Sequence, residues 1–207
     1  MELGMIGLGR MGANMARRLT QAGHTVIGYT RQPQKAEALV QEGAIARGVT
    51  SFVELVDALT KPRIIWLMLP AATVNATLHT LMPLLNTDDI VVDGGNSYYI
   101  DDIRRAAQLK IKGIEYIDCG TSGGIWGAER GYCLMIGGKV RAVKRLDPIF
   151  AAWLPVWQPH RVRPVVSLWS EQLSRAICIV GLTVRDTLSK WFTTALSMVL
   201  WQPMPKG

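Results

Sequence analysis

The chain has 207 residues, of which 49% are hydrophobic and 19% are charged, and its net charge is +7. This composition predicts a globular protein with a sizeable core and excludes a disordered chain, and the lack of any run of about 20 apolar residues excludes a membrane span. The basic residues are dispersed, so the charge favours a small phosphorylated ligand as much as a polymer.

Apolar stretches alternate with helical patterns at a regular spacing in the first part of the chain. Strands are predicted at residues 2–8, 25–29, 63–69, 90–92, 114–117 and 132–136. Helices are predicted at residues 11–21, from about 33, at 51–59, from about 73, at 99–112 and from about 139. Ser51 and Glu54 form a capping box for the third helix. Strands that alternate with crossover helices predict an α/β fold with a Rossmann-type doubly wound parallel sheet.

The sequence changes character near residue 152. Residues 1–151 contain 18 of the 20 glycines and two of the seven tryptophans, whereas residues 152–207 contain five tryptophans and half of the ten prolines. The second part shows no sustained period of a strand or a helix. We therefore predict one folded domain over residues 1–151 and an irregular tail over residues 152–207.

The first chemical motif is a G-x-G-x-x-G sequence directly after the first predicted strand and at the start of the first predicted helix. Gly7 allows a tight turn, Gly9 lets the backbone approach a pyrophosphate, and Gly12 permits close helix packing. The helix N-terminus presents free N–H groups to phosphates. This context favours a dinucleotide site over a plain glycine turn. The motif comprises Gly7, Leu8, Gly9, Arg10, Met11 and Gly12.

The second motif follows the second predicted strand, where a site that prefers NAD places an acidic residue for the ribose 2′-hydroxyl. This chain has Thr30, Arg31 and Gln32 there. A guanidinium can bind a 2′-phosphate with two parallel hydrogen bonds, whereas a carboxylate would repel it. The motif therefore favours NADP, with NAD as the alternative if Arg31 is only a solvated loop residue.

The third motif, D-G-G-N-S at residues 93–97, lies between a predicted strand and a predicted helix. On spacing alone, a turn followed by a Ser or Asn helix cap explains it best. The strand ends of such a sheet face the ligand crevice, however, so the amide of Asn96 could bridge cofactor and substrate.

The fourth motif, G-T-S-G-G-I-W-G at residues 120–127, follows the strand predicted to end at residue 117. Small residues there leave room for a ligand, and Ser122 with the amides of Gly123 and Gly124 can donate hydrogen bonds to an anion. A flexible linker is an equally good explanation. Trp126 is expected to serve packing rather than to stack on a ligand ring.

The remaining reactive side chains form no catalytic pattern. Asp101 and Asp102 fall early in a predicted helix, where they complement the helix dipole. The chain has no signal-peptide pattern at its start, and we expect a cytoplasmic protein. Three cysteines are too few and too scattered for a disulfide framework or a zinc site: Cys119, Cys133 and Cys178.

Three segments together resemble a known family. They are I-G-L-G-R-M-G-A-N-M, V-D-G-G-N-S and G-T-S-G-G-I-W-G-A-E-R-G-Y-C-L-M-I-G-G, and in this order and spacing they closely resemble decarboxylating 6-phosphogluconate dehydrogenase, especially its shorter bacterial form. The resemblance covers residues 1 to about 151. It implies a coenzyme domain of an enzyme that oxidises 6-phosphogluconate at C3 with NADP and releases CO2, leaving ribulose 5-phosphate.

The resemblance also implies roles for individual residues. Residues 7–12 would hold the pyrophosphate, and residues 30–32 the ribose phosphate. Asn96 would contact both cofactor and substrate. The residues that would flank the cofactor are Met68, Leu69 and Pro70, and those that would contact the substrate are Ser122, Gly123 and Gly124.

The tail departs from the family. Members continue into a helical domain whose K-M-V-H-N-G-I-E-Y motif supplies a lysine as general base and a glutamate as acid, and neither is present here. Because members pair largely through that helical domain, the resemblance does not carry their homodimer over to this chain. No residue of this chain is therefore predicted to be catalytic.

The genetic code offers an explanation for the tail. When each codon is regrouped as its last base plus the first two bases of the next, residues 189–199 permit K-M-V-H-N-G-I-E-Y-G. Residues 175–181 similarly permit G-Y-L-H-C-G. We hypothesise that residues from about 152 are translated out of frame, by a genuine frameshift or a sequencing error.

Three functions remain open on the sequence alone. The first is the oxidoreductase that the in-frame gene would encode, and the second is a non-catalytic dinucleotide-binding remnant of it. The third, a basic nucleic-acid-binding protein, is disfavoured because the basic residues are not interleaved with aromatic ones. A small-molecule partner, and no nucleic acid or membrane, is therefore expected.

Overall fold

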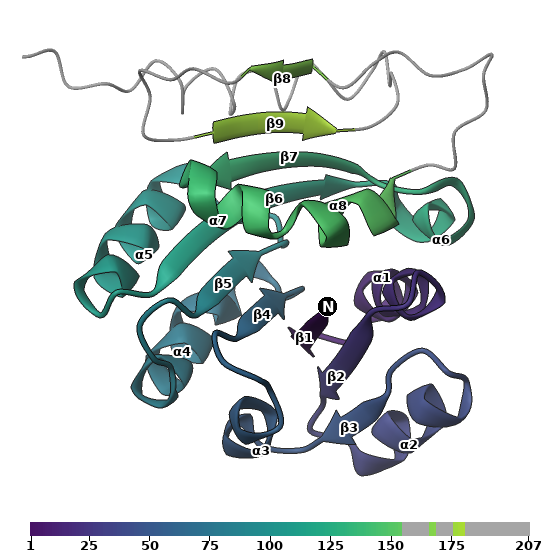
Figure 1. Ribbon diagram of the computed structural model, residues 1–207. Helices are drawn as coiled ribbons and strands as arrows, with labels where there is room; N and C mark the ends of the chain where they lie inside the picture. The colour runs from purple at the N-terminus through teal and green to yellow at the C-terminus, as the bar shows by residue number, and fades with distance from the viewer. Residues whose placement is uncertain (155–165, 169–175, 181–207) are drawn as a thin grey trace, which may run out of the picture.

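The structure is a computed structural model that describes residues 1–154, 166–168 and 176–180 (Figure 1). Its centre is a sheet whose described strands lie in the order β3-β2-β1-β4-β5-β6-β7-β9-β8. The strands β1 to β6 are parallel, and this order reverses direction between β1 and β4. The predicted Rossmann-type doubly wound fold is confirmed. An edge of antiparallel strands, beginning with β7, extends the parallel sheet.

Each predicted strand and helix occurs, most of them with shifted ends, and further short elements are present beside them. The strands are β1 (Glu2–Ile6), β2 (Thr25–Tyr29), β3 (Arg47–Val49), β4 (Ile64–Leu67), β5 (Ile90–Asp93), β6 (Glu115–Ser122), β7 (Cys133–Gly138), β8 (Val166–Leu168) and β9 (Ala176–Val180). The α-helices are α1 (Arg10–Gln21), α2 (Pro33–Gln41), α3 (Phe52–Asp57), α4 (Ala71–Leu81), α5 (Tyr99–Ile111), α6 (Gly127–Arg130), α7 (Val140–Arg145) and α8 (Asp147–Trp153). Two 3-10 turns are η1 (Met82–Leu84) and η2 (Gly124–Trp126).

Helices cover both faces of the sheet (Figure 1). One apolar cluster joins α1, α2, α7 and α8 to the sheet, and the other joins α3, α4 and α5 to its opposite face. Strand β4 is buried along its whole length, as expected of a parallel strand between two helical layers. The sheet is therefore the middle of three layers, and the loops lie at the ends of its strands.

The capping box is confirmed at the start of α3. The Glu54 backbone N–H donates to Ser51 Oγ at 3.1 Å, and the Glu54 carboxylate accepts from the Thr50 N–H at 3.0 Å. Two otherwise unpaired backbone donors are thus satisfied by side chains, which fixes where this helix begins.

Within residues 1–154, two strands differ from the sequence-based expectation. Strand β3 is absent from the prediction, because its three residues are too few to show a strand pattern. It contains Gly48, where a Cβ would lie 2.4 Å from the Ala36 Cβ, so that glycine lets α2 pack closely on the strand. Strand β6 was predicted to end at residue 117, but it continues to Ser122 because β7 pairs antiparallel with its second half. The length of β6 is therefore decided by its pairing with β7, a later segment of the chain, and not by the sequence of β6 alone.

Helix α8 passes through the predicted domain break after residue 151. Trp153, its last residue, is fully buried and packs edge-on against Trp66 of β4, with ring centroids 4.3 Å apart. The Trp153 indole N–H donates to the Met15 carbonyl at 2.9 Å, and the Trp153 carbonyl accepts from the Tyr132 N–H at 2.7 Å. The packed domain thus includes residue 153.

Two strands of the predicted irregular tail are described. Strand β9 pairs antiparallel with β7, from Leu134 opposite Val180 to Gly138 opposite Ala176, and β8 pairs with β9. The regrouped segment at residues 189–199 lies outside the described residues.

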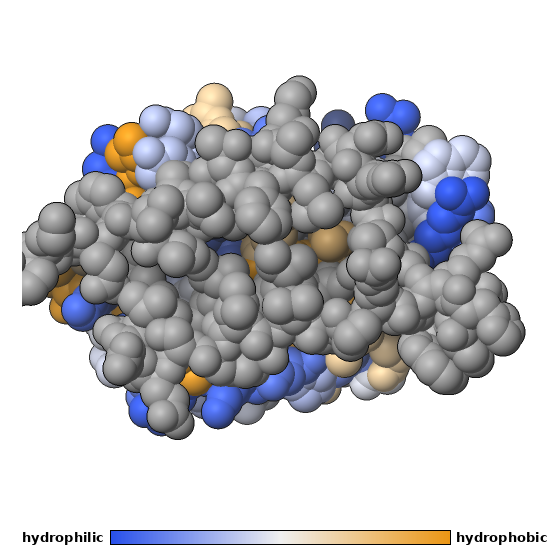
Figure 2. Space-filling view, turned by 90° about the horizontal axis from the view of Figure 1, so that it is seen from above, coloured by the Kyte–Doolittle hydropathy of each residue, from blue (hydrophilic) through white to orange (hydrophobic). Residues whose placement is uncertain are grey.

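On the face viewed from above in Figure 2, the described residues that are visible at the margin of the molecule are mostly hydrophilic, with a few hydrophobic ones. Among the described residues, no helix combines the length and apolar character needed to cross a membrane.

Candidate nucleotide-binding site

The G-x-G-x-x-G motif forms the turn between β1 and α1. Gly7 has φ +99°, and a Cβ there would lie 2.3 Å from the Met68 carbonyl oxygen. A Cβ at Gly12 would lie 2.1 Å from the Gly7 carbonyl oxygen. These two positions therefore require glycine for the fold of the turn itself. Leu8 is buried in the core, so only its backbone can contact a ligand.

Gly9 differs from the other two glycines because its side is open. Among the described residues, no heavy atom would lie within 4 Å of a Cβ at Gly9, and the residue has extended backbone angles that any side chain tolerates. Neither Gly7 nor Gly12 has such space. The structure of the turn therefore leaves Gly9 free of any packing requirement, as expected where a ligand must approach the backbone.

The N-terminus of α1 is suited to an anion. No side chain caps its first N–H groups, and its first turn contains no acidic residue. Arg10 is exposed and Met11 half-buried at this end of the helix. Unpaired N–H groups and the positive end of the helix dipole bind phosphate, so these residues fit the diphosphate of a dinucleotide.

The ends of β2 and β4 flank this turn. Ile6 of β1 is paired with Tyr29 on one side and with Leu67 on the other, which places Thr30 and Met68 beside Gly7. Arg31 and Gln32 are exposed, and the Gln32 N–H donates to Thr30 Oγ1 at 3.2 Å. The sheet order reverses between β1 and β4, and such a reversal is where ligands bind in open α/β sheets.

The segment after β4 and the loop after β5 are in close contact. A Cβ at Gly95 would lie 2.6 Å from the Leu69 carbonyl oxygen, and one at Gly94 would lie 2.4 Å from the indole nitrogen of Trp66. Met68 and Leu69 are half-buried and Pro70 is exposed, as is Asn96 on the neighbouring loop. The predicted cofactor-flanking residues and Asn96 thus lie at the same edge of the sheet.

A buried polar cluster lies directly beneath the D-G-G-N-S loop. Asp93 Oδ1 accepts from the Gly95 N–H at 2.9 Å, and Asp93 Oδ2 accepts from the Ser97 hydroxyl at 2.7 Å. Ser97 thus binds Asp93 through its side chain and does not cap α5, whose N-cap is Tyr98. The Ser or Asn cap that spacing alone favours is therefore wrong, whereas the turn expected before it is present in the bond from the Gly95 N–H to Asp93.

Three further residues complete this cluster, Asp102 and Arg105 from α5 and Tyr116 from β6. Asp102 is only 4% exposed and accepts from Arg105 at 2.9 Å and from the Tyr116 hydroxyl at 2.8 Å. Its predicted role as a partner of the helix dipole is therefore incomplete, because the carboxylate is buried and paired. Sequence reasoning missed Arg105 and Tyr116, although an arginine three residues after Asp102 was a signal for an ion pair on one helix face.

Burial changes the acidity of the cluster. It raises the pKa of Asp102 from 3.8 to about 6, and it raises the pKa of Tyr116 so that the phenol remains a hydrogen-bond donor. Asp118 lies opposite Asp93 on the next strand. Its burial, followed by the charges of Asp102 and Asp93, raises the pKa of Asp118 well above its usual value. Two buried carboxylates thus pair with one guanidinium, and the Asp118 carboxyl group lies close enough to be affected by their charges.

The fourth motif is ordered by strand pairing. Ser122 is the last residue of β6 and pairs with Cys133, so the alternative of a flexible linker is wrong for Thr121 and Ser122. Gly123 and Gly124 follow with φ +151° and φ +52°, and both are exposed. Trp126 is 57% exposed, with the Arg130 guanidinium 5.5 Å from its ring, so the expectation that it serves packing is wrong.

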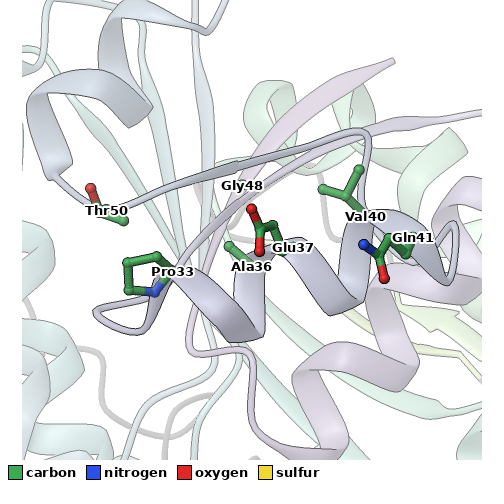
Figure 3. Close-up of a pocket in the computed structure, with 7 residues that line it drawn as sticks. All are labelled: Pro33, Ala36, Glu37, Val40, Gln41, Gly48 and Thr50. Atoms are coloured by element: carbon green, nitrogen blue, oxygen red, sulfur yellow. The ribbon is translucent and has the colours of Figure 1, made fainter.

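A separate hollow of about 410 Å³ lies between α2 and the end of β3 (Figure 3). None of the predicted site residues lines it. Its walls are formed by Pro33, Ala36, Glu37, Val40, Gln41, Gly48 and Thr50.

The predicted residues therefore gather at one edge. Residues 7–12, 30–32, 68–70 and 96 follow the carboxyl ends of β1, β2, β4 and β5, and residues 122–124 follow the end of β6. The fold and this edge define a dinucleotide-binding protein of the Rossmann class.

Comparison with known proteins gives the family. The NAD-binding domain of 6-phosphogluconate dehydrogenase matches residues 2–155. The NAD(+)-dependent, decarboxylating 6-phosphogluconate dehydrogenase of Haloferax volcanii is 45% identical over 153 residues, which are 73% of this chain and 50% of that protein. The NADP(+)-dependent enzyme of Bacillus subtilis is 42% identical over 154 residues, 73% of this chain and 33% of that protein.

A solved structure of the same family has a similar fold. Plasmodium falciparum 6-phosphogluconate dehydrogenase, studied in its apo form and with NADP+ or 6-phosphogluconate, has a TM-score of 0.67 and 30% identity over 72% of this chain and 33% of that one. The chain belongs to the family of the NAD-binding domain of 6-phosphogluconate dehydrogenase. It spans half or less of the length of these relatives.

Proposed function

We propose that this chain is the coenzyme-binding part of an enzyme that oxidatively decarboxylates 6-phosphogluconate to ribulose 5-phosphate and CO2 with NADP. The observation that carries the proposal is the open, uncapped turn at Gly9 and the N-terminus of α1, at the point where the sheet order reverses. Relatives with this activity share more than 40% of the aligned residues.

Each part of the edge has a role in this proposal. The N–H groups at the start of α1 bind the diphosphate, and Met68, Leu69 and Pro70 lie against the nucleotide. Asn96, Ser122 and the amides of Gly123 and Gly124 hold the sugar acid. When bound, NADP supplies the hydride acceptor for C3 of the substrate. The chain's own contribution is to bind and orient both molecules.

The preference for NADP rests on Arg31. We expect Arg31→Gln to weaken NADP binding about tenfold or more, because a charge-assisted contact to the 2′-phosphate is lost, and to change NAD binding little. Calorimetric titration of both variants with both nucleotides measures this. Arg47→Gln is the matched control, because Arg47 is also an exposed arginine but lies on β3, away from the end of β2. Equal loss of NADP and NAD affinity would contradict the assignment of the 2′-phosphate to Arg31.

A second function, a non-catalytic dinucleotide-binding remnant, is favoured for the chain as it stands. Its reading frame contains neither the lysine nor the glutamate of the family's K-M-V-H-N-G-I-E-Y motif. Both functions are explained if residues from about 152 are read out of frame, since the regrouped codons permit that motif at residues 189–199.

Restoring the frame tests this explanation. We expect the purified chain to bind NADP but to form negligible NADPH with 6-phosphogluconate, and a gene with the frame restored just after codon 152 to give an active enzyme. Sequencing the gene across codons 150–155 distinguishes a genuine shift from a sequencing error. NADPH formation by the chain itself, or an inactive frame-restored protein, would count against it.

A further inference from the structure

We propose that Arg105 is a positioning residue that connects the Gly94–Ser97 loop, which carries Asn96, to helix α4 and that, with Asp93, Ser97 and Tyr116, it fixes the conformation of this loop. The importance of that loop for a ligand rests on the proposed function. The structural part of the proposal concerns the free protein and stands on contacts within it.

Arg105 reaches the D-G-G-N-S loop from α5. Its Nη1 donates to Ser97 Oγ at 2.9 Å and to Asp93 Oδ2 at 3.2 Å. Asp93 in turn accepts from the Gly95 N–H at 2.9 Å, so the guanidinium is one step from the loop backbone. Arg105 is only 2% exposed, and no bulk water competes for these bonds.

Arg105 also reaches the helix that follows the segment after β4. Its Nε donates to Asn75 Oδ1 of α4 at 2.8 Å, one turn from the start of that helix. Residues 68–70 lead directly into α4, and residues 94–97 lead into α5. A single planar guanidinium thus joins the Gly94–Ser97 loop to the helix that follows residues 68–70, which a lysine with one point charge cannot reproduce.

Tyr116 closes the cluster from below. Its hydroxyl lies 3.2 Å from Asp93 Oδ2 and 2.8 Å from Asp102 Oδ1, and the side chain is buried. From the other side, the Gly94 and Gly95 backbone lies against Trp66 and the Leu69 carbonyl. The Gly94–Ser97 loop is therefore in contact with β4 and the segment after it on one side. On the α5 side, side-chain hydrogen bonds fix it. Asn96 itself remains exposed at the tip of the loop.

Backbone amide exchange in the free protein tests the proposal directly. We expect Arg105→Lys and Ser97→Ala to accelerate exchange of the Gly95 amide about tenfold or more, with amides of β1 much less affected. Arg104→Lys is the matched control, because Arg104 is the neighbouring arginine on α5 and its ion pair with Asp101 is exposed. Tyr116→Phe, which keeps the ring and removes the hydroxyl, provides a milder variant should Arg105→Lys fail to fold.

Two outcomes would overturn the proposal. One is an unchanged Gly95 exchange rate in the folded Ser97→Ala and Tyr116→Phe variants. The other is equal acceleration of Gly95 and β1 amides, which would mean that the cluster contributes only general stability. Titration with NADP is a separate measurement: failure of the parent chain to bind it would refute the proposed function and leave the exchange result intact. We expect weaker NADP binding in Ser97→Ala than in Arg104→Lys.

Discussion

Gly9→Val is expected to abolish most dinucleotide binding while leaving the fold intact. In the part of the chain that the structure describes, a Cβ at Gly9 meets no heavy atom within 4 Å, and φ −68° with ψ −173° suits valine, so its Cβ causes neither a clash nor backbone strain. The side chain would instead fill the space in front of the α1 N–H groups. Loss of several charge-assisted contacts to a diphosphate predicts an affinity lower by about a hundredfold or more.

Calorimetry with NADP and thermal unfolding measure the two halves of this expectation. Gly137→Val is the control, since a Cβ at Gly137 of β7 also has no heavy atom of the described residues within 4 Å and Gly137 needs no positive φ. The unfolding free energy of the Gly9 variant should change by no more than about 0.5 kcal/mol. A folded Gly9→Val protein that binds NADP as the parent does would show that the diphosphate lies elsewhere.

Trp153→Ala is expected to destabilise the domain by about 3–5 kcal/mol, the usual cost of removing a buried tryptophan. The side chain is fully buried against Trp66, and its N–H bond to the Met15 carbonyl ties α8 to α1. Truncation would leave a large cavity and would remove the bond that the indole N–H donates to the Met15 carbonyl. Denaturant unfolding followed by far-ultraviolet circular dichroism measures the change without depending on tryptophan emission.

Trp126→Ala is the comparison for Trp153. Trp126 is 57% exposed, and its loss should change the unfolding free energy by no more than about 0.5 kcal/mol. The pair also tests where the folded domain ends. If the packed domain stopped at residue 151, as the change in composition predicts, Trp153→Ala would be as harmless as Trp126→Ala.

Local patterns predict where most residues of the candidate site lie in the fold. The G-x-G-x-x-G motif and the small residues after each strand depend on short-range geometry: a turn that only glycine can form and a helix that begins without a cap. In a parallel α/β sheet, successive strand ends lie at one edge, so Arg31, Met68 and Asn96 are brought to the same edge as Gly9.

The errors have a common physical origin in distant contacts. Ser122 is part of a strand because Cys133 pairs with it, and Asp102 is buried because Tyr116 and Arg105 enclose it. Trp126, on η2, is exposed, because whether another element covers a side chain is also decided outside its own segment. No periodicity within one segment contains this information.

The sequence by itself determined the alternation of strands and helices, the glycine turn at Gly7–Gly12 and the family, because each is encoded by neighbouring residues. Tertiary structure alone decided that Arg105 holds the D-G-G-N-S loop and that Trp153 belongs to the core. Both depend on side chains from three or more elements meeting in a space that only the folded sheet creates.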